Sequence, residues 1–213
     1  MIVKDLLNVY DTLEQSHDLT KTCYSIRDVF KPNGFHSSLD GVDVRDKGFR
    51  TKLLGDPKGD KHNAFFNKIC HPNNISEEFQ KLSNTFKNIL LEENIDEYIK
   101  KTARFYFDFL LLHPFSDGNG RIARILTIMM LNHKGINLTS LFAGNLDNYT
   151  FNIKIANKAL DNDYTAIENR LYDIIFKRCN SKIFNSENEN KRDEYDKQLK
   201  EQKDKIDIGE IEI

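Results

Sequence analysis

The stretch of sequence that decides this fold is His113-Pro114-Phe115-Ser116-Asp117-Gly118-Asn119-Gly120-Arg121, with Arg124 three residues further on. A strongly apolar run precedes it, and proline disfavours helical geometry at the residue before it, so a helix should end near His113. Gly118 and Gly120 permit positive φ angles around Asn119, which would turn successive backbone N–H groups inward to form a concave anion site. The stretch therefore predicts a phosphate-binding loop after a buried helix.

A second helix is expected directly after this loop. Apolar residues recur there at helical spacing: Ile122, Ile125, Leu126 and Met129. We therefore predict a helix that begins at about Arg121 and buries this stripe. Its first-turn N–H groups and the positive end of its dipole attract anions. Arg121 and Arg124 lie on one helical face, and each offers a planar fork for phosphate oxygens.

Two further side chains of the stretch carry the chemistry of group transfer. A polyphosphate nucleotide usually arrives with Mg²⁺, which often relies on only one or two protein carboxylates, and Asp117 is the candidate. His113 has an ordinary pKa of about 6.5, so it can accept a proton from an attacking hydroxyl. Each residue alone would usually be a cap, a turn or a solvated face. Their order and spacing together favour nucleotidyl or phosphoryl transfer.

Residues 113–121 resemble the core motif of the Fic (filamentation induced by cAMP) family: His-Pro-Phe, any residue, Asp or Glu, then Gly-Asn-Gly-Arg, with a second arginine three residues on. Every specified position matches, and the resemblance is strongest over residues 97–135. It implies transfer of AMP from ATP, with Mg²⁺, to a Ser, Thr or Tyr hydroxyl of a target protein, with release of pyrophosphate. The implied fold is mainly α, a helical bundle with a small β-hairpin flap beside the active site.

The resemblance also implies a role for each residue of the motif. His113 is the expected general base, Asp117 the expected metal ligand, and Phe115 the aromatic residue that anchors the loop to the core. The remaining residues are expected to hold the nucleotide: Gly118, Asn119 and Gly120 around the α-phosphate, and Arg121 and Arg124 at the β- and γ-phosphates.

A β-hairpin flap that aligns the target by strand addition is the second element implied by the resemblance. Our candidate is residues 41–54, where Asp46-Lys47-Gly48 is the turn signal and the alternation of apolar residues is only partial. The residues expected to dock the target are Gly48, Phe49, Arg50, Thr51 and Lys52.

Many Fic proteins carry an inhibitory helix in which Ser or Thr stands four residues before a glutamate that pairs with the second motif arginine. No glutamate of this sequence has Ser or Thr at that position. We therefore expect Arg124 to lack an intramolecular clamp. The expectation is a bacterial Fic toxin inhibited in trans by a small antitoxin-like partner, or an enzyme with no inhibitor.

Two other function classes stay open at this point. One is the same fold transferring a different phosphate-containing group, such as phosphate, UMP or phosphocholine. The phosphate-transferring relatives carry Ala and Lys where this chain has Gly118 and Gly120, which favours AMP. The other class is a non-catalytic protein that senses nucleotide, and the intact His113 argues against it.

Composition and charge limit the partners and the cellular location expected for such a protein. The chain of 213 residues has a formal net charge of −2, so no direct nucleic-acid partner is expected. It has no run of about 18 apolar residues, which argues against a membrane segment. Cys23, Cys70 and Cys179 lack metal-ligand spacing and are typical of reduced thiols, so we expect a cytoplasmic protein. Whether copies form a homo-oligomer is left open.

Periodicity divides the chain into one domain and a tail. Residues 1–185 are expected to form the Fic domain, and residues 186–213 a charged C-terminal helix or tail. Helices are expected near residues 6–13, from Ser76 as N-cap to residue 90, over residues 95–112 and 122–132 with Gly135 just past the end, and over residues 149–160 and 165–177.

Overall fold

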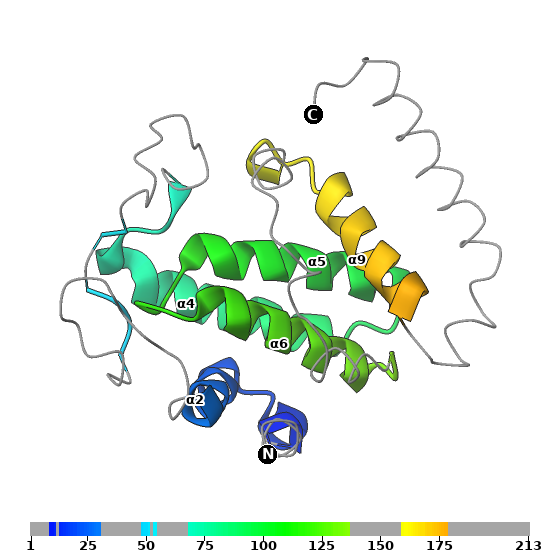
Figure 1. The fold of residues 1–213 in the computed structure, drawn as a ribbon, viewed down its shortest axis with the longest axis horizontal. Coiled ribbons are helices and arrows are strands. Elements are labelled where there is room, and N and C mark those ends of the chain that lie inside the picture. Colours follow the sequence, from blue (N-terminus) through cyan, green and yellow to red (C-terminus); the bar gives the residue numbers. More distant parts are fainter. Residues whose placement is uncertain are drawn as a thin grey trace.

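The computed structural model describes residues 9–11, 13–30, 48–51, 53–54, 68–136 and 159–178. These residues are built of helices, with no strand among them: α2 (Leu19–Phe30), the 3₁₀ helix η1 (Pro72–Asn74), α4 (Ile75–Leu90), α5 (Ile95–Leu112), α6 (Asn119–His133) and α9 (Thr165–Arg178). Residues 9–11 and 13–16 are also helical. The predicted mainly α fold is confirmed (Figure 1).

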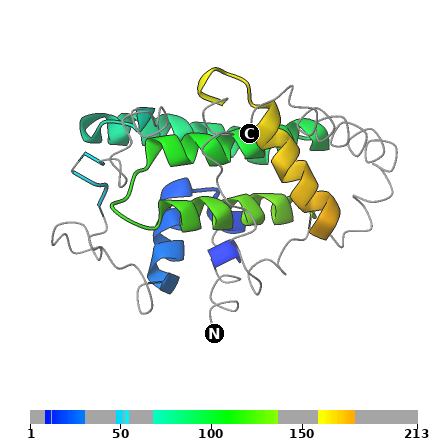
Figure 2. The same ribbon diagram turned by 45° about the horizontal axis from the view of Figure 1, so that its top comes forward.

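Helix α5 is the centre of the bundle. It packs against α4, α6 and α9, while α2 packs against α6 and α4. Figures 1 and 2 both show α6 lying between α5 and α2. The buried side chains of α5 occupy most of its circumference: Tyr98, Ile99, Thr102, Ala103, Phe105, Tyr106, Phe107, Phe109, Leu110 and Leu112. A helix that is apolar nearly all round is a buried one, which confirms the expected central helix.

Both ends of α5 follow from local sequence signals. The Asn94 side chain caps its start, since the amide oxygen accepts from the N–H groups of Asp96 at 3.0 Å and Glu97 at 3.1 Å. The helix ends at Leu112, directly before the His113-Pro114 pair. The predicted bounds of residues 95–112 are therefore confirmed.

Helix α6 buries the predicted apolar stripe and ends where the glycine signal indicated. Gly135 has a φ angle of 76°, and the N–H of Ile136 reaches back to the Leu131 carbonyl oxygen at 2.9 Å. This arrangement closes a helix by satisfying its last carbonyl groups. The start of α6 at Asn119 lies before the predicted start at Arg121, which changes the role of the loop residues described below.

The start of α4 differs from the prediction. Ser76 was expected as N-cap, but the helix begins at Ile75, after Asn74 with φ −99° and ψ −8°. The chain is already turning at Pro72, where the proline ring fixes a helical φ and the 3₁₀ helix η1 starts. Ser76 therefore lies inside α4 and cannot cap it.

Helix α2 was not predicted, although its signals are present in the sequence. The Asp18 carboxylate accepts from the Lys21 N–H at 3.0 Å, a capping contact at the start of the helix. Leu19, Cys23 and Ile26 are fully buried and lie at helical spacing along one face. This helix matters because it carries side chains to the motif loop.

Several predictions fall on parts of the chain outside the described residues. Residues 41–47 and Lys52 of the expected flap are among them, and no strand occurs at residues 48–51 or 53–54, so the hairpin stays a prediction. The expected helix over residues 149–160 is described only at its last two residues, and the tail over residues 186–213 not at all. No helix in the described ranges has the length and apolar character that crossing a bilayer requires.

Candidate active site

His113 occupies the C-cap position of α5 with a left-handed backbone, φ 46° and ψ 57°. Its N–H still donates to the Phe109 carbonyl oxygen at 3.0 Å, so the chain leaves the helix only at this residue. A left-handed backbone costs a non-glycine residue roughly 1–3 kcal/mol and persists where surrounding contacts impose it. Histidine is among the residues that tolerate this conformation best.

The His113 imidazole is oriented by the helix that it ends. Its Nδ1 atom lies 3.2 Å from the Leu110 carbonyl oxygen, which can only accept, so Nδ1 carries the proton. Nε2 then keeps its lone pair. Burial lowers the pKa of His113 to about 4, against the opposing effect of the Leu110 hydrogen bond. The ring is therefore a neutral base at neutral pH, which is the state that general-base chemistry needs.

The low pKa of His113 predicts how acid affects the fold. In the unfolded chain the ring has its ordinary pKa of about 6.5, so below this pH the unfolded state binds the proton first. The contribution of the neutral ring to the free energy of unfolding is complete above about pH 6.5 and decreases as the pH falls to about 4.

We therefore expect wild type to lose more stability between about pH 7 and about pH 5 than the His113→Gln protein, in which residue 113 no longer titrates. Urea denaturation of both proteins across this range measures the difference. An equal loss in the two proteins would contradict the lowered pKa.

The Asn119 side chain holds the loop between α5 and α6. Its amide oxygen accepts from the Phe115 N–H at 3.0 Å, and its amide nitrogen donates to the Phe115 carbonyl oxygen at 2.7 Å. Asn119 is 1% exposed, so these bonds satisfy both halves of a buried amide. We expected Asn119 in the anion hole. Its side chain instead ties the first residue of α6 to the loop, which leaves its backbone N–H for an anion.

Phe115 anchors the loop to the core, as the resemblance implied, and is 1% exposed. Its ring centroid lies 6.0 Å from that of Tyr24 and 6.1 Å from that of Phe49. The Arg27 guanidinium stands 4.4 Å from the same centroid, within cation–π range. Tyr24 and Arg27 both come from α2, so sequence analysis missed them because it had not predicted that helix.

The N-terminus of α6 offers an anion site. Its N-cap is Gly118, which has no side chain to bond the first-turn N–H groups. Nη1 of Arg124 lies 3.8 Å from the point where a Cβ on Gly120 would stand, so this guanidinium reaches back over the first turn. The Arg124 Nε atom is buried and meets no hydrogen-bond partner in the described part of the chain. A bound phosphate group would supply the oxygen that this buried donor needs.

The two glycines of the loop act differently from each other. Gly118 has the predicted positive φ, 82°, and turns the chain into α6. The same prediction for Gly120 is wrong, because α6 begins at Asn119 and Gly120 has an ordinary helical backbone. Its missing side chain leaves space beside Arg124 at the helix N-terminus.

Asp117 places a partly exposed carboxylate between the loop and α6. Its Oδ1 accepts from the Gly118 N–H at 2.6 Å, and its Oδ2 lies 3.5 Å from Nη2 of Arg121. No group of three or more His, Cys, Asp or Glu side chains within the described ranges could hold a metal by itself. A single carboxylate fits Mg²⁺, which takes oxygen ligands and fills its other positions with water and substrate phosphates. Asp117 is therefore the residue that would hold Mg²⁺ arriving with a nucleotide.

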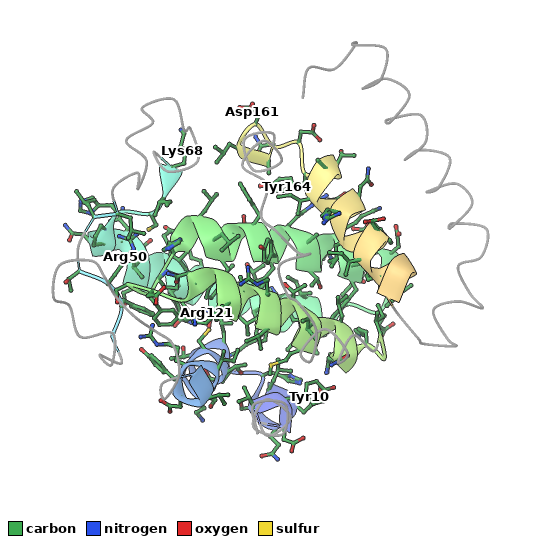
Figure 3. The ribbon with its side chains drawn as sticks, in the orientation of Figure 1. Tyr10, Arg50, Lys68, Arg121, Asp161 and Tyr164 are labelled. Carbon is green, nitrogen blue, oxygen red and sulfur yellow. The ribbon has the colours of Figure 1, made fainter. Side chains whose placement is uncertain are left out.

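Two residues that were expected to dock a target lie against the protein's own interior. Phe49 packs on Phe79 of α4, with ring centroids 4.9 Å apart. Arg50 is 6% exposed, and its backbone N–H donates to the Pro114 carbonyl oxygen at 2.9 Å. Figure 3 shows Arg50 and Arg121 toward the same end of the bundle. Phe49 and Arg50 thus both contact residues of the motif loop, Phe49 through the Phe115 ring and Arg50 through the Pro114 carbonyl.

The remaining docking candidates are placed only in part. Gly48 and Thr51 are exposed, and Lys52 lies outside the described residues. A docking role for this segment stays a prediction. Gly48 and Thr51 are accessible to a target protein.

The fold and the site together define a helical protein in which a histidine ends α5 and a short loop leads from it to the uncapped N-terminus of α6. The chain belongs to the Fic/DOC family, because the model of that family matches residues 5–131, more than half of its length. The match covers α2, α4 and α5 and nearly all of α6, so it contains the whole motif loop.

One similar protein of Aquifex aeolicus (strain VF5) is named "probable protein adenylyltransferase". It is 40% identical to this chain over 55 residues, which are 26% of this chain and 17% of the relative. The similarity thus spans a small part of the relative, and it supports the family rather than an activity of the whole protein.

Proposed function

We propose that this protein transfers AMP from ATP to a Ser, Thr or Tyr hydroxyl of a target protein, with release of pyrophosphate. The observation that carries the proposal is the His113 ring, whose Nδ1 is bonded to Leu110 and whose Nε2 is left as a base. The N-terminus of α6 has no side-chain cap, and the buried Nε of Arg124 has no hydrogen-bond partner among the described residues. Both observations support the binding of nucleotide phosphates at this helix end. The name of the Aquifex relative supports adenylyl transfer for that protein.

Binding of the triphosphate uses the two arginines and the helix end. The Arg124 fork donates to phosphate oxygens, which satisfies its buried Nε. Arg121, now 3.5 Å from Asp117, lies within the first turn of α6 and can turn its own fork to the same phosphates. Asp117 would hold the Mg²⁺ that neutralises charge on the phosphate oxygens.

The transfer itself is a single displacement at the α-phosphorus. The target hydroxyl gives its proton to Nε2 of His113 while its oxygen forms a bond to the α-phosphorus. The bond from that phosphorus to the oxygen bridging it to the β-phosphate breaks, and pyrophosphate leaves with the electron pair. The first-turn N–H groups of α6 stabilise the charge that builds on the α-phosphate oxygens.

ATP labelled separately at the α- and γ-phosphate tests the proposal on the purified chain with Mg²⁺ and candidate target proteins. We expect protein-bound label from the α position only, and the mass of AMP on a Ser, Thr or Tyr of the labelled protein. Label from the γ position would show a kinase instead. ATP binding without label from either position would show a nucleotide sensor, and both results would overturn the proposal.

Replacing Arg124 with alanine is expected to weaken ATP binding about 10- to 100-fold, because a charge-assisted hydrogen bond to phosphate is worth about 1.5–3 kcal/mol. Titration calorimetry with ATP and Mg²⁺ measures the change. The matched control is Arg104→Ala, which removes the same charge from α5 where Arg104 pairs with Glu168 at 2.7 Å. We expect the control to bind ATP like wild type. Unchanged affinity in Arg124→Ala would exclude this arginine from the nucleotide site.

A further inference from the structure

Arg50 is bonded to three carbonyl groups around the motif loop, although the proposed reaction gives it no role. Its Nε donates to the His113 carbonyl oxygen at 2.7 Å, and its Nη2 donates to the Cys70 carbonyl oxygen. Its backbone N–H donates to the Pro114 carbonyl oxygen at 2.9 Å. The residue is 6% exposed, so an arginine has been buried to make these bonds.

These hydrogen bonds belong to a network that joins Arg50 and Cys70 to the C-terminal end of α5. The Cys70 N–H donates to the Leu111 carbonyl oxygen at 2.9 Å, and the Cys70 carbonyl accepts from Arg50, which in turn holds His113. The last carbonyl groups of a helix have no partner within it, so Cys70 and Arg50 supply the missing donors. A cation at a helix C-terminus also interacts favourably with the helix dipole.

The hydrogen-bond network holds the backbone on both sides of His113, the residue with the left-handed conformation. The His113 N–H is held by Phe109, its carbonyl by the Arg50 side chain, and the following carbonyl by the Arg50 backbone. The peptide groups on either side of the left-handed Cα are therefore both fixed. In this turn Nδ1 lies 3.2 Å from the Leu110 carbonyl oxygen, the contact that leaves Nε2 as the base.

We propose that Arg50 is a positioning residue for His113, which holds its left-handed backbone so that the imidazole keeps Nδ1 protonated and presents Nε2. The effect on catalysis rests on the proposed function, whereas the effect on the imidazole does not. Burial is the main cause that lowers the pKa of His113, and the charge of Arg50 adds to it, which agrees with a close and rigid placement.

Nitrogen-15 NMR of histidine-labelled full-length chain tests the placement directly, because the two ring nitrogens have different shifts when one carries the proton. The His113→Gln protein identifies the His113 signal among the six histidines of the chain. We expect a single tautomer with protonated Nδ1 in wild type. In Arg50→Met and Arg50→Lys we expect a mixture of both tautomers, because methionine has no donor and lysine lacks the planar fork whose separate Nε and Nη2 atoms reach the His113 and Cys70 carbonyl groups.

Kinetics of the same proteins provide the second measurement. We expect kcat for AMP transfer to fall on the order of 10- to 100-fold in both Arg50 variants, because a misplaced base loses near-attack geometry. The dissociation constant for ATP should stay as in wild type. Ile89→Ala is the control for lost stability, since Ile89 is buried in α4 at 3% exposure and does not belong to the loop. It should keep both the Nδ1 tautomer and kcat.

The possible outcomes separate the inference from the proposed function. An unchanged tautomer in both variants overturns the positioning role, whatever happens to kcat. A mixture of tautomers with an unchanged kcat would overturn the role of Arg50 in catalysis. If Arg50→Met does not fold, Arg50→Lys decides by the same two readings. If wild type transfers no AMP at all, the proposed function fails, and the tautomer comparison still decides whether Arg50 places the ring.

Discussion

The His113→Ala protein is expected to show a kcat for AMP transfer that is lower by about 10²- to 10⁴-fold, the usual contribution of a general base. The reason is the lost Nε2 lone pair, which accepts the proton of the target hydroxyl in the proposed displacement. ATP binding should change little, because the arginines and the N-terminus of α6 remain. Transfer rates with label from the α-phosphate, together with calorimetry, measure both quantities.

A second substitution at the same position separates chemistry from backbone strain. His113 has a φ angle of 46°, where alanine is strained and asparagine is tolerated. We expect His113→Ala to lower the melting temperature and His113→Asn to lower it less, with both equally inactive. If the more stable His113→Asn protein transferred AMP faster than His113→Ala, activity would depend on stability rather than on the base. That result would remove His113 from its assigned role.

The Phe115→Ala protein is expected to lose about 3–5 kcal/mol of the free energy of unfolding, the usual cost of emptying a buried phenylalanine site. Phe115 is fully buried, and it contacts Tyr24 and Arg27 of α2 and the ring of Phe49. For a chain of this length such a loss lowers the melting temperature by roughly 6–20 °C. Calorimetry or thermal circular dichroism measures it.

Phe115→Leu is the matched control, since it keeps most of the buried apolar volume and leaves the two Asn119 hydrogen bonds to the backbone in place. It is expected to lose less than half as much stability as the alanine variant. Phe115→Ala should also weaken ATP binding, because the loop that leads into α6 loses its anchor. A melting temperature equal to that of wild type would show that the loop is held by its hydrogen bonds alone.

The features that local sequence predicted correctly are those that local physics decides. Helix α5 begins after Asn94 because that side chain caps it, and it ends before Pro114 because proline disfavours further helix. Gly135 ends α6 because it adopts the required left-handed backbone. Family resemblance assigned roles to the motif residues, since residues 113–121 match at every specified position, and these roles stay predictions.

Most of the contacts that local sequence did not indicate join residues that are distant in sequence. Phe49 and Arg50, which were expected to dock a target, lie against the motif loop, which follows more than sixty residues later. The unpredicted α2 brings Arg27 and Tyr24 to Phe115. Asn119 lies only four residues from Phe115, yet its side-chain hydrogen bonds to that residue were not predicted, and its place in an anion hole stays a prediction. No periodicity or motif records which distant carbonyl or ring a side chain will meet.

The sequence by itself determined the helical class and the bounds of the central helix, and it named the candidates for binding phosphate and accepting a proton, because capping, proline and spacing act within a few residues. Only the tertiary structure placed Nδ1 of His113 against the Leu110 carbonyl oxygen in a site where burial lowers the pKa of the ring, and brought Arg50 to the His113 carbonyl oxygen. Burial lowers a pKa, and a buried guanidinium finds carbonyl partners, only when separate segments have come together.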